Sequence, residues 1–212
     1  LVGFGTQFLD GELDGLPDLV VTNGHVYDLS YQGRPYRMSP QYFRNLGGGR
    51  FEELGPQKSG DFFSQKLLGR GLARLDWNRD GREDFAVSHL NSAAALVLND
   101  TPQADVGHYF AIQLRGTASN RDAIGTRIRI VTASNVLNEQ LTAGDGYESS
   151  NQRQIIVGTG TERRVIQVEV RWLSGLVQAF GPFDSESEIM IVEGCPRVHK
   201  LSRKPLSSGL KR

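Results

Sequence analysis

Residues 10–26 read DGELDGLPDLVVTNGHV, and residues 76–92 read DWNRDGREDFAVSHLNS. Aligned on their aspartates, the two stretches match at a single offset of 66 residues. The matched positions are Asp10 with Asp76, Asp14 with Asp80, Gly15 with Gly81, and Asp18 with Asp84. In each copy an oxygen-rich turn lies between two apolar stretches, which predicts a β-hairpin. The chain therefore contains an internal structural repeat.

A second similarity follows each predicted hairpin. Residues 42–45 and 96–99 are short strand-like segments that each end on asparagine, and residues 51–54 complete another hairpin after the glycines at 47–49. Strand, polar turn, strand, turn and strand is the order found in a four-stranded propeller blade. In residues 27–70 this pattern is interrupted by polar and aromatic side chains. We therefore interpret these residues as an insertion on one face of the repeat structure.

The composition narrows the class of protein. The 212 residues include 24 basic and 24 acidic side chains, so the overall charge does not favour nucleic acid or an anionic membrane. The 25 glycines favour many tight turns, and Cys195 alone can form neither an internal disulfide nor a cysteine-rich zinc site. No apolar run is long enough to span a bilayer. Because the chain opens without methionine on a strand-like segment, we expect further N-terminal blades.

The second half alternates apolar and polar residues. Residues 165–172 place Ile166, Val168, Val170 and Trp172 on one face of a strand, which we predict to be buried in the core, and residues 110–115 alternate in the same way. Turn clusters recur at intervals that suit a small antiparallel β-sandwich or barrel. We predict an all-β chain without long helices, with partial propeller blades over 1–103, a β-domain over 104–194 and a disordered basic tail over 195–212.

Both repeated turns carry oxygen ligands at alternate positions. Calcium prefers six to eight oxygens, and such a turn can direct several of them at one point. The candidate ligands are Asp10, Glu12, Asp14 and Asp18 in the first turn, and Asp76, Asn78, Asp80 and Asp84 in the second. Because crowded carboxylates repel one another, a bound cation is the favoured interpretation. The alternative is that both are ordinary polar hairpin turns.

These features resemble two known families. Residues 1–100 resemble the FG-GAP or VCBS repeats of integrin-like β-propellers, through the two aspartate turns and through Phe43-Arg44-Asn45 with Gly49-Arg50-Phe51. Residues 107–193 are similar to the ASPIC/UnbV domain found in proteins similar to cartilage acidic protein and in bacterial exported proteins. The residues that carry this second resemblance are Leu114 to Thr117, Ser119 to Gly125, Gly144 to Tyr147, Val170 to Trp172, and Ser174-Gly175.

The resemblance implies a function but no reaction. It implies a secreted, periplasmic or cell-surface protein that binds Ca²⁺ and serves in interaction or adhesion with a protein or glycan partner. We therefore expect no catalytic activity. The alternative is a hydrolase or other enzyme, or an accessory subunit of one, that uses a cleft on the propeller face. A histidine such as His25 or His89 facing an aspartate in such a cleft would favour that alternative.

Overall fold

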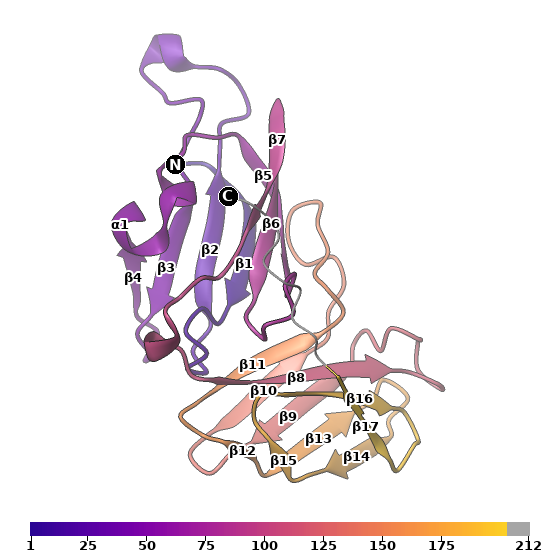
Figure 1. Ribbon diagram of the computed structural model, residues 1–212. Helices are drawn as coiled ribbons and strands as arrows, with labels where there is room; N and C mark the ends of the chain where they lie inside the picture. Colours follow the sequence, from indigo (N-terminus) through magenta and orange to yellow (C-terminus); the bar gives the residue numbers. More distant parts are fainter. Residues whose placement is uncertain (203–212) are drawn as a thin grey trace.

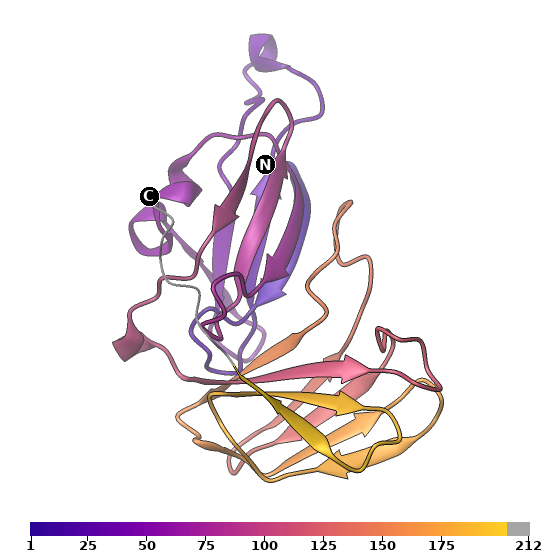
Figure 2. The ribbon, with the colours of Figure 1, turned by 45° about the vertical axis from the view of Figure 1, so that its right-hand side comes forward.

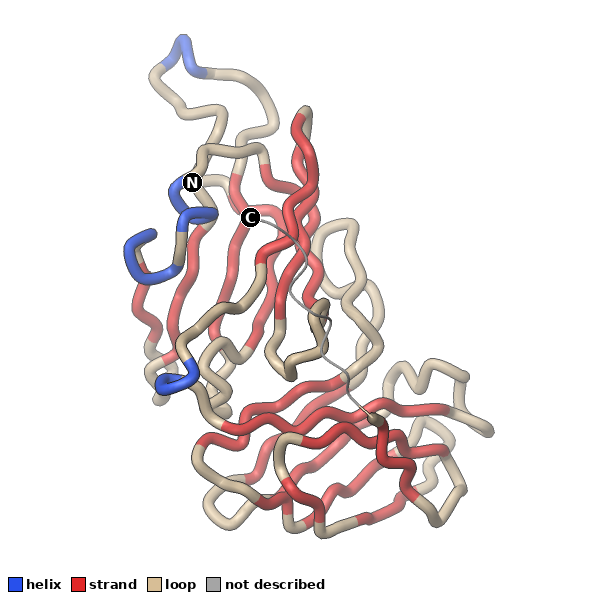
Figure 3. Tube along the Cα trace, in the orientation of Figure 1, coloured by secondary structure: helices blue, strands red, loops and turns tan. Residues whose placement is uncertain are grey.

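The computed structural model describes residues 1–202, and nearly all of its regular structure is β-strand. Figures 1 and 2 show two stacked sheets in the first half of the chain above a β-sandwich formed by the second half. The only helical segments in the described part are short: α1 spans Pro56–Ser59, and single 3₁₀ turns span Ser30–Gln32, Asp61–Ser64 and Gln103–Asp105. The tube in Figure 3 shows how little helix this is, and the predicted all-β class is confirmed.

The first sheet is an antiparallel meander in the order β1-β2-β3-β4. Its strands are β1 (Gly3–Leu9), β2 (Asp18–Asn23), β3 (Gln41–Asn45) and β4 (Phe51–Leu54). The segment between β2 and β3 leaves this sheet as an exposed loop, where Tyr27 and Tyr31 are largely solvent-accessible. The region predicted as an insertion therefore contains both an exposed loop and two strands of the sheet.

The second sheet repeats the first hairpin. Its strands are β5 (Gly69–Leu75), β6 (Asp84–His89) and β7 (Ser92–Val97), in that order. Leu9 pairs with Asp18 in the first sheet, and Leu75 pairs with Asp84 in the second, so the two registers keep the offset seen in the sequence. The described part of the second sheet has three strands, one fewer than the first.

A compact apolar cluster joins these two sheets. It contains Leu9, Val20, Phe63, Leu72, Phe85 and Val87, all buried. Phe63 comes from the 3₁₀ turn at Asp61–Ser64 and makes edge-to-face ring contacts with Tyr42 and Phe85. Such contacts add to the free energy gained by burying apolar area. The insertion thus closes one end of the space between the two sheets.

The second half forms a sandwich of two four-stranded sheets. One sheet has the order β11-β8-β16-β17, the other β10-β9-β13-β14, and β12 pairs with β15 beside them. The strands are β8 (His108–Arg115), β9 (Arg127–Val131), β10 (Val136–Gln140), β11 (Ile155–Gly160), β12 (Arg164–Val165), β13 (Gln167–Arg171), β14 (Val177–Phe180), β15 (Phe183–Asp184), β16 (Ser187–Val192) and β17 (Val198–Leu201).

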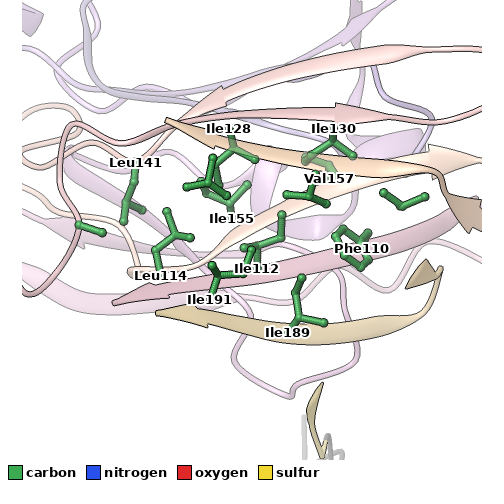
Figure 4. Close-up of a cluster of buried hydrophobic side chains, with 14 of the residues drawn as sticks. Phe110, Ile112, Leu114, Ile128, Ile130, Leu141, Ile155, Val157, Ile189 and Ile191 are labelled. Atoms are coloured by element: carbon green, nitrogen blue, oxygen red, sulfur yellow. The ribbon is translucent and has the colours of Figure 1, made fainter. Parts of the chain in front are cut away.

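The sandwich core lies between these two sheets. Phe110, Ile112 and Leu114 of β8 face Ile128 and Ile130 of β9 across it, as Figure 4 shows. Trp172 is 2% exposed and donates its indole N–H to Gln178, so its predicted core position is confirmed. Alternation in β8 and β9 follows from this arrangement, because successive strand residues point to opposite faces.

Three details differ from the sequence prediction. β8 and β16 run parallel, so the sandwich is not purely antiparallel. Ile166 is 50% exposed, because the chain leaves the small β12–β15 sheet at this residue before β13 begins, and Val165 is buried in its place. The tail predicted from residue 195 begins later, since Val198–Leu201 forms edge strand β17 against β16.

The reason for the third difference is that an edge strand needs few apolar residues. In β17, Val198 is the residue packed against the sandwich core, and backbone pairing with β16 holds the rest. The remainder of the predicted tail, residues 203–212, lies outside the described residues. Within residues 1–202, no helix has the length and apolar character needed to cross a membrane.

Candidate metal centres

The two aspartate-rich turns occupy the same end of their sheets. We call residues 10–18, between β1 and β2, the first loop, and residues 76–84, between β5 and β6, the second loop. Both loops lie at the end of the upper sheets that faces β8 and β11 (Figure 1). This placement follows from the repeat, because each hairpin turns at the same point relative to its sheet.

The first aspartate of each loop accepts the same two backbone N–H groups. Asp10 Oδ1 accepts from Asp14 N at 3.0 Å and Oδ2 from Gly15 N at 2.8 Å. In the second loop Asp76 accepts from Asp80 N at 3.1 Å and from Gly81 N at 3.2 Å. Both glycines have positive φ, as a chain that folds back around a carboxylate requires.

The last aspartate of each loop closes it in the same way. One oxygen of Asp18 accepts from Gly11 N and the other from Asn45 N, at 3.2 and 2.7 Å. Asp84 accepts from Trp77 N and Asn99 N, both at 2.8 Å. The asparagines that end the two predicted outer strands therefore have the same role in each repeat, and the repeat extends to individual hydrogen bonds.

Burial and crowding alter the acidity of these carboxyl groups. Burial and the charges of Asp14 and Asp18 together raise the pKa of Asp10 to about 7, although the hydrogen bonds from Gly15 N and Asp14 N oppose the rise. Burial and the charges of Asp80 and Asp76 likewise raise the pKa of Asp84 to about 6. Crowded carboxylates of this kind are stabilised by a nearby cation.

Glu12 is the first loop's exception. Its carboxylate pairs with Arg44 Nε at 3.1 Å, and burial together with the neighbouring Asp18 raises its pKa to about 7. Asp18 in turn accepts the Tyr42 hydroxyl at 2.5 Å. In the second loop the corresponding residue is Asn78, which donates to Asp80 at 3.0 Å. An arginine pair at this ligand position is thus confined to the first loop, whereas in the second loop Arg82 Nε lies 3.9 Å from Asp80.

The candidate ligands are close in sequence and charge but are not drawn into a single cage. Among residues 1–202, no three acidic, histidine or cysteine side chains already converge as a metal site. Asp14 is exposed and Asp80 is half-buried at the loop tips, while the aspartates that flank them are buried. The donors are nevertheless oxygens, which hard cations such as Ca²⁺ prefer. The chemistry of both loops therefore fits this ion.

Both loops also contact the second half of the chain, which the sequence did not indicate. In the first loop Glu12 O accepts from Gly107 N at 2.8 Å and Leu13 O from Gly160 N at 2.9 Å. Asp10 Oδ2 accepts from Gly158 N at 3.2 Å. A β-carbon on Gly158 would lie 2.2 Å from the Leu13 backbone, so this approach requires glycine there.

Equivalent residues of the two loops reach the same sheet. Leu13, with φ of 56°, is 1% exposed and packs against Ala111 and Ile156. Arg79, with φ of 62°, pairs with the buried Glu188 of β16 at 3.3 Å. The two loops therefore contact the outer face of the β11-β8-β16-β17 sheet at β8, β11 and β16. An apolar residue inside a polar turn was the available sequence signal for Leu13.

The segment between β10 and β11 makes a second contact with the first half. The side chain of Gln7 donates to Asp145 O and accepts from Asn151 Nδ2, the latter at 3.0 Å. Arg74 N donates to Asn151 Oδ1 at 2.9 Å, and Asp76 N donates to Gln152 Oε1 at 2.8 Å. These bonds run along the edge of β5 and satisfy backbone groups that would otherwise be unpaired.

Glu193 organises the loops at the far end of the sandwich. Its buried carboxylate accepts from the backbone N–H groups of Thr117, Ala118 and Ser119 and from the hydroxyls of Ser119 and Ser174. Burial raises its pKa, but the hydrogen bonds outweigh burial and lower the pKa to about 2. Thr117, Ser119 and Ser174 therefore act as donors to one buried anion.

A hollow of about 970 Å³ opens beside the first loop, and Glu12, Tyr42 and Arg44 line it. Neither His25 nor His89 lines this hollow. His89 Nδ1 lies 2.7 Å from Ala93 O, and its ring lies against Phe62. His25 Nδ1 accepts from Tyr27 N at 3.1 Å, and within residues 1–202 neither histidine is hydrogen-bonded to an aspartate side chain.

Comparison with known proteins adds information on the second half. A search of curated proteins finds no match to the chain. Residues 116–197 match the protein family described as ASPIC and UnbV. The match covers the sandwich from the segment after β8 to the residue before β17, including the residues that surround Glu193. The second half of the chain is therefore similar to the ASPIC and UnbV family.

Proposed function

We propose that this chain is a calcium-binding interaction or adhesion module of the cell surface, periplasm or extracellular space, without catalytic activity of its own. The observation that carries the proposal is the repeated loop. Two turns 66 residues apart keep three aspartates and a glycine at matched positions, and the first aspartate of each accepts the same two backbone hydrogen bonds. One aspartate of each loop, Asp10 and Asp84, has a raised pKa, which a bound cation would lower.

The stacking of the sheets supports a blade of the FG-GAP or VCBS type. One face of the first sheet carries Leu9 and Val20. It packs against the face of the second sheet that carries Phe85 and Val87. The residues equivalent to Phe85 and Val87 in the first sheet are Leu19 and Val21, on its opposite face. Phe8 lies opposite Leu19 on that face and is 54% exposed.

Repeated stacking of this kind is head to tail, because each sheet offers a different face to each neighbour. A further sheet of the same kind would cover Phe8 as the first sheet covers Phe85. We therefore propose that the first half consists of propeller blades that pack with further blades. The weak calcium affinity typical of extracellular modules would suit a structural ion in these loops.

Thermal unfolding tests the calcium proposal directly. At 2 mM Ca²⁺ and dissociation constants of roughly 0.1–1 mM, each loop should gain about 0.6–1.8 kcal/mol relative to chelator. The double variant Asp14→Ala/Asp80→Ala should lose this gain. A matched variant, Asp122→Ala/Asp184→Ala, removes two exposed carboxylates outside the loops and should keep it.

Magnesium provides a second control, because it demands a smaller and more regular ligand set. It should give a smaller shift than calcium. An unfolding midpoint that is the same in calcium and in chelator would mean that both loops are ordinary polar turns. Equal loss of the shift in the loop variant and the matched variant would mean that calcium acts on general surface charge.

A further inference from the structure

The outer face of the β10-β9-β13-β14 sheet carries three exposed arginines. Arg127 and Arg129 lie on β9 and Arg171 on β13, and all three side chains point away from the sandwich core. The strand register places Arg127 directly opposite Arg171, and Arg129 directly opposite Glu169. The three arginines line a shallow hollow of about 380 Å³ on this face. We call this surface the arginine face.

The arginine face has too few carboxylates to balance its charge. Glu169 lies 3.6 Å from Arg171, and no other ion pair within residues 1–202 involves Arg127, Arg129 or Arg171. Glu139 also lines the hollow, but it pairs in register with the buried Ile128, and its side chain belongs to the opposite face. Like charges directly opposite each other destabilise a sheet, so an anion would relieve Arg127 and Arg171.

The neighbouring strand β10 places side-chain amides directly beside the arginines of β9. Gln140 lies directly opposite Arg127, and Asn138 lies directly opposite Arg129. Guanidinium groups bind sulfate and carboxylate through paired N–H donors, while amides can both donate to and accept from hydroxyl groups. The rows of β9, β10 and β13 that line the hollow contain no aromatic residue for nucleobases to stack on.

We propose that the arginine face binds an acidic polysaccharide, with Arg127 and Arg171 holding its sulfate or carboxylate groups and Gln140 and Asn138 its hydroxyls. This inference rests on the proposed function, since it names the glycan partner of an extracytoplasmic module. The chain carries equal numbers of acidic and basic side chains, so binding would depend on this face and not on overall charge.

Direct binding of heparin tests the proposal, measured by calorimetry at several salt concentrations. Arg127→Gln/Arg171→Gln should weaken binding at least tenfold and make it less dependent on salt, because fewer counterions are released. Glu169→Gln should strengthen binding by removing the carboxylate beside Arg171. The matched variant Arg121→Gln/Arg164→Gln removes two exposed arginines outside the face and should bind like the parent.

Further probes separate the possible outcomes. Hyaluronate, which carries carboxylates alone, should bind more weakly than heparin, and neutral dextran should not bind. Equal weakening by the two arginine double variants, tighter binding of duplex DNA than of heparin, or no heparin binding at low salt would each overturn the proposal. Because the calcium test reads unfolding and this test reads binding, a calcium shift without heparin binding refutes this inference alone, and the reverse refutes the calcium proposal alone.

Discussion

The two aspartate loops share a hydrogen-bond framework but differ in what surrounds it. In both, the first and last aspartates accept backbone N–H groups at equivalent positions. The first loop then buries Leu13 and places Glu12 against Arg44, whereas the second exposes Trp77 and directs Arg79 to Glu188. The framework thus depends on the local sequence, and the surroundings depend on the partner surface.

This comparison suggests that each loop has two separable roles. The carboxylates hold the turn together and are the candidate ligands for a cation. The residue at the left-handed position, Leu13 or Arg79, connects the turn to the outer face of the β11-β8-β16-β17 sheet. Substitutions at equivalent positions should therefore have unequal effects, which allows the two roles to be tested pair by pair.

The largest difference is expected between Leu13→Ala and Arg79→Ala. Removing the buried leucine should lower the free energy of unfolding by about 2–5 kcal/mol, because it leaves a cavity beside Ala111. Removing the arginine should cost about 1 kcal/mol, because its side chain is 44% exposed and Glu188 keeps two amide donors. Urea unfolding measures both values.

Leu176→Ala, at a leucine that is 40% exposed, is the control for loss of a leucine side chain and should cost under about 1 kcal/mol. Equal losses for Leu13→Ala and Arg79→Ala would contradict the idea that the first loop supplies the apolar part of the contact.

The next largest difference is expected between alanine substitutions at the two loop glycines. Both Gly15 and Gly81 have positive φ, so alanine at either should cost about 1–2 kcal/mol. At Gly81 a β-carbon would also lie 2.3 Å from the Tyr109 ring, whereas at Gly15 its nearest neighbour would be at 3.4 Å. Gly81→Ala should therefore cost about 1–3 kcal/mol more than Gly15→Ala.

Gly175→Ala isolates the backbone contribution. Gly175 has φ of 93°, and no atom lies within 4 Å of the position that a β-carbon would occupy there. Its substitution therefore reports the cost of the left-handed conformation alone. If Gly81→Ala and Gly175→Ala destabilise the chain equally in urea unfolding, the second loop does not pack tightly against Tyr109.

The first loop separates the features that the sequence predicts from those that it does not. Asp10, Asp14, Gly15 and Asp18 could be placed on a hairpin turn because the interactions that form the turn are local and occur twice. The burial of Leu13 could not, because its partners Ala111 and Ile156 lie about a hundred or more residues away in the chain. Contacts of this length leave no periodic pattern within the loop itself.

The sequence prediction was also wrong where one strand ends and another begins, and at an edge strand. Ile166 continues an alternating pattern, yet the chain changes sheets there, and the pattern carries no sign of the change. Val198–Leu201 lacks such a pattern because an edge strand packs mainly through its backbone. Glu193 was missed because a single acidic residue at a strand end reveals nothing about the N–H groups that converge on it.

Glu193 extends the comparison to a carboxylate that is buried without acidic neighbours. Its folded-state pKa of about 2 lies below the ordinary 4.5, so its stabilising effect is present above pH 4.5 and is lost as the pH falls toward 2. The shift corresponds to roughly 3 kcal/mol. Glu193→Gln should therefore destabilise the chain at pH 7 and reduce its loss of stability between pH 5 and pH 2.5.

Chemical unfolding at several pH values measures this effect. Glu52→Gln, at an exposed glutamate, provides the control and should follow the parent chain at every pH. A Glu193→Gln variant whose stability falls with acid as steeply as the parent's would show that the converging hydrogen bonds do not favour the ionised form.

The smallest expected effect is a difference in calcium affinity between the two loops. Arg44 holds Glu12 at 3.1 Å, so calcium must compete with a guanidinium for one ligand of the first loop. In the second loop Arg82 lies 3.9 Å from Asp80, but its guanidinium donates to Thr101 O and Gln103. The second loop should therefore bind calcium more tightly.

Calcium titration followed by thermal unfolding should then rank three variants. Asp80→Ala should remove more of the calcium-induced stabilisation than Asp14→Ala, by about 0.5 kcal/mol at 2 mM Ca²⁺. Arg44→Gln should increase the calcium-induced gain, because it frees Glu12, even though it lowers stability in chelator. If Arg44→Gln leaves the calcium gain unchanged, then Glu12 is not a ligand, and the first loop differs from the second in chemistry as well as in surroundings.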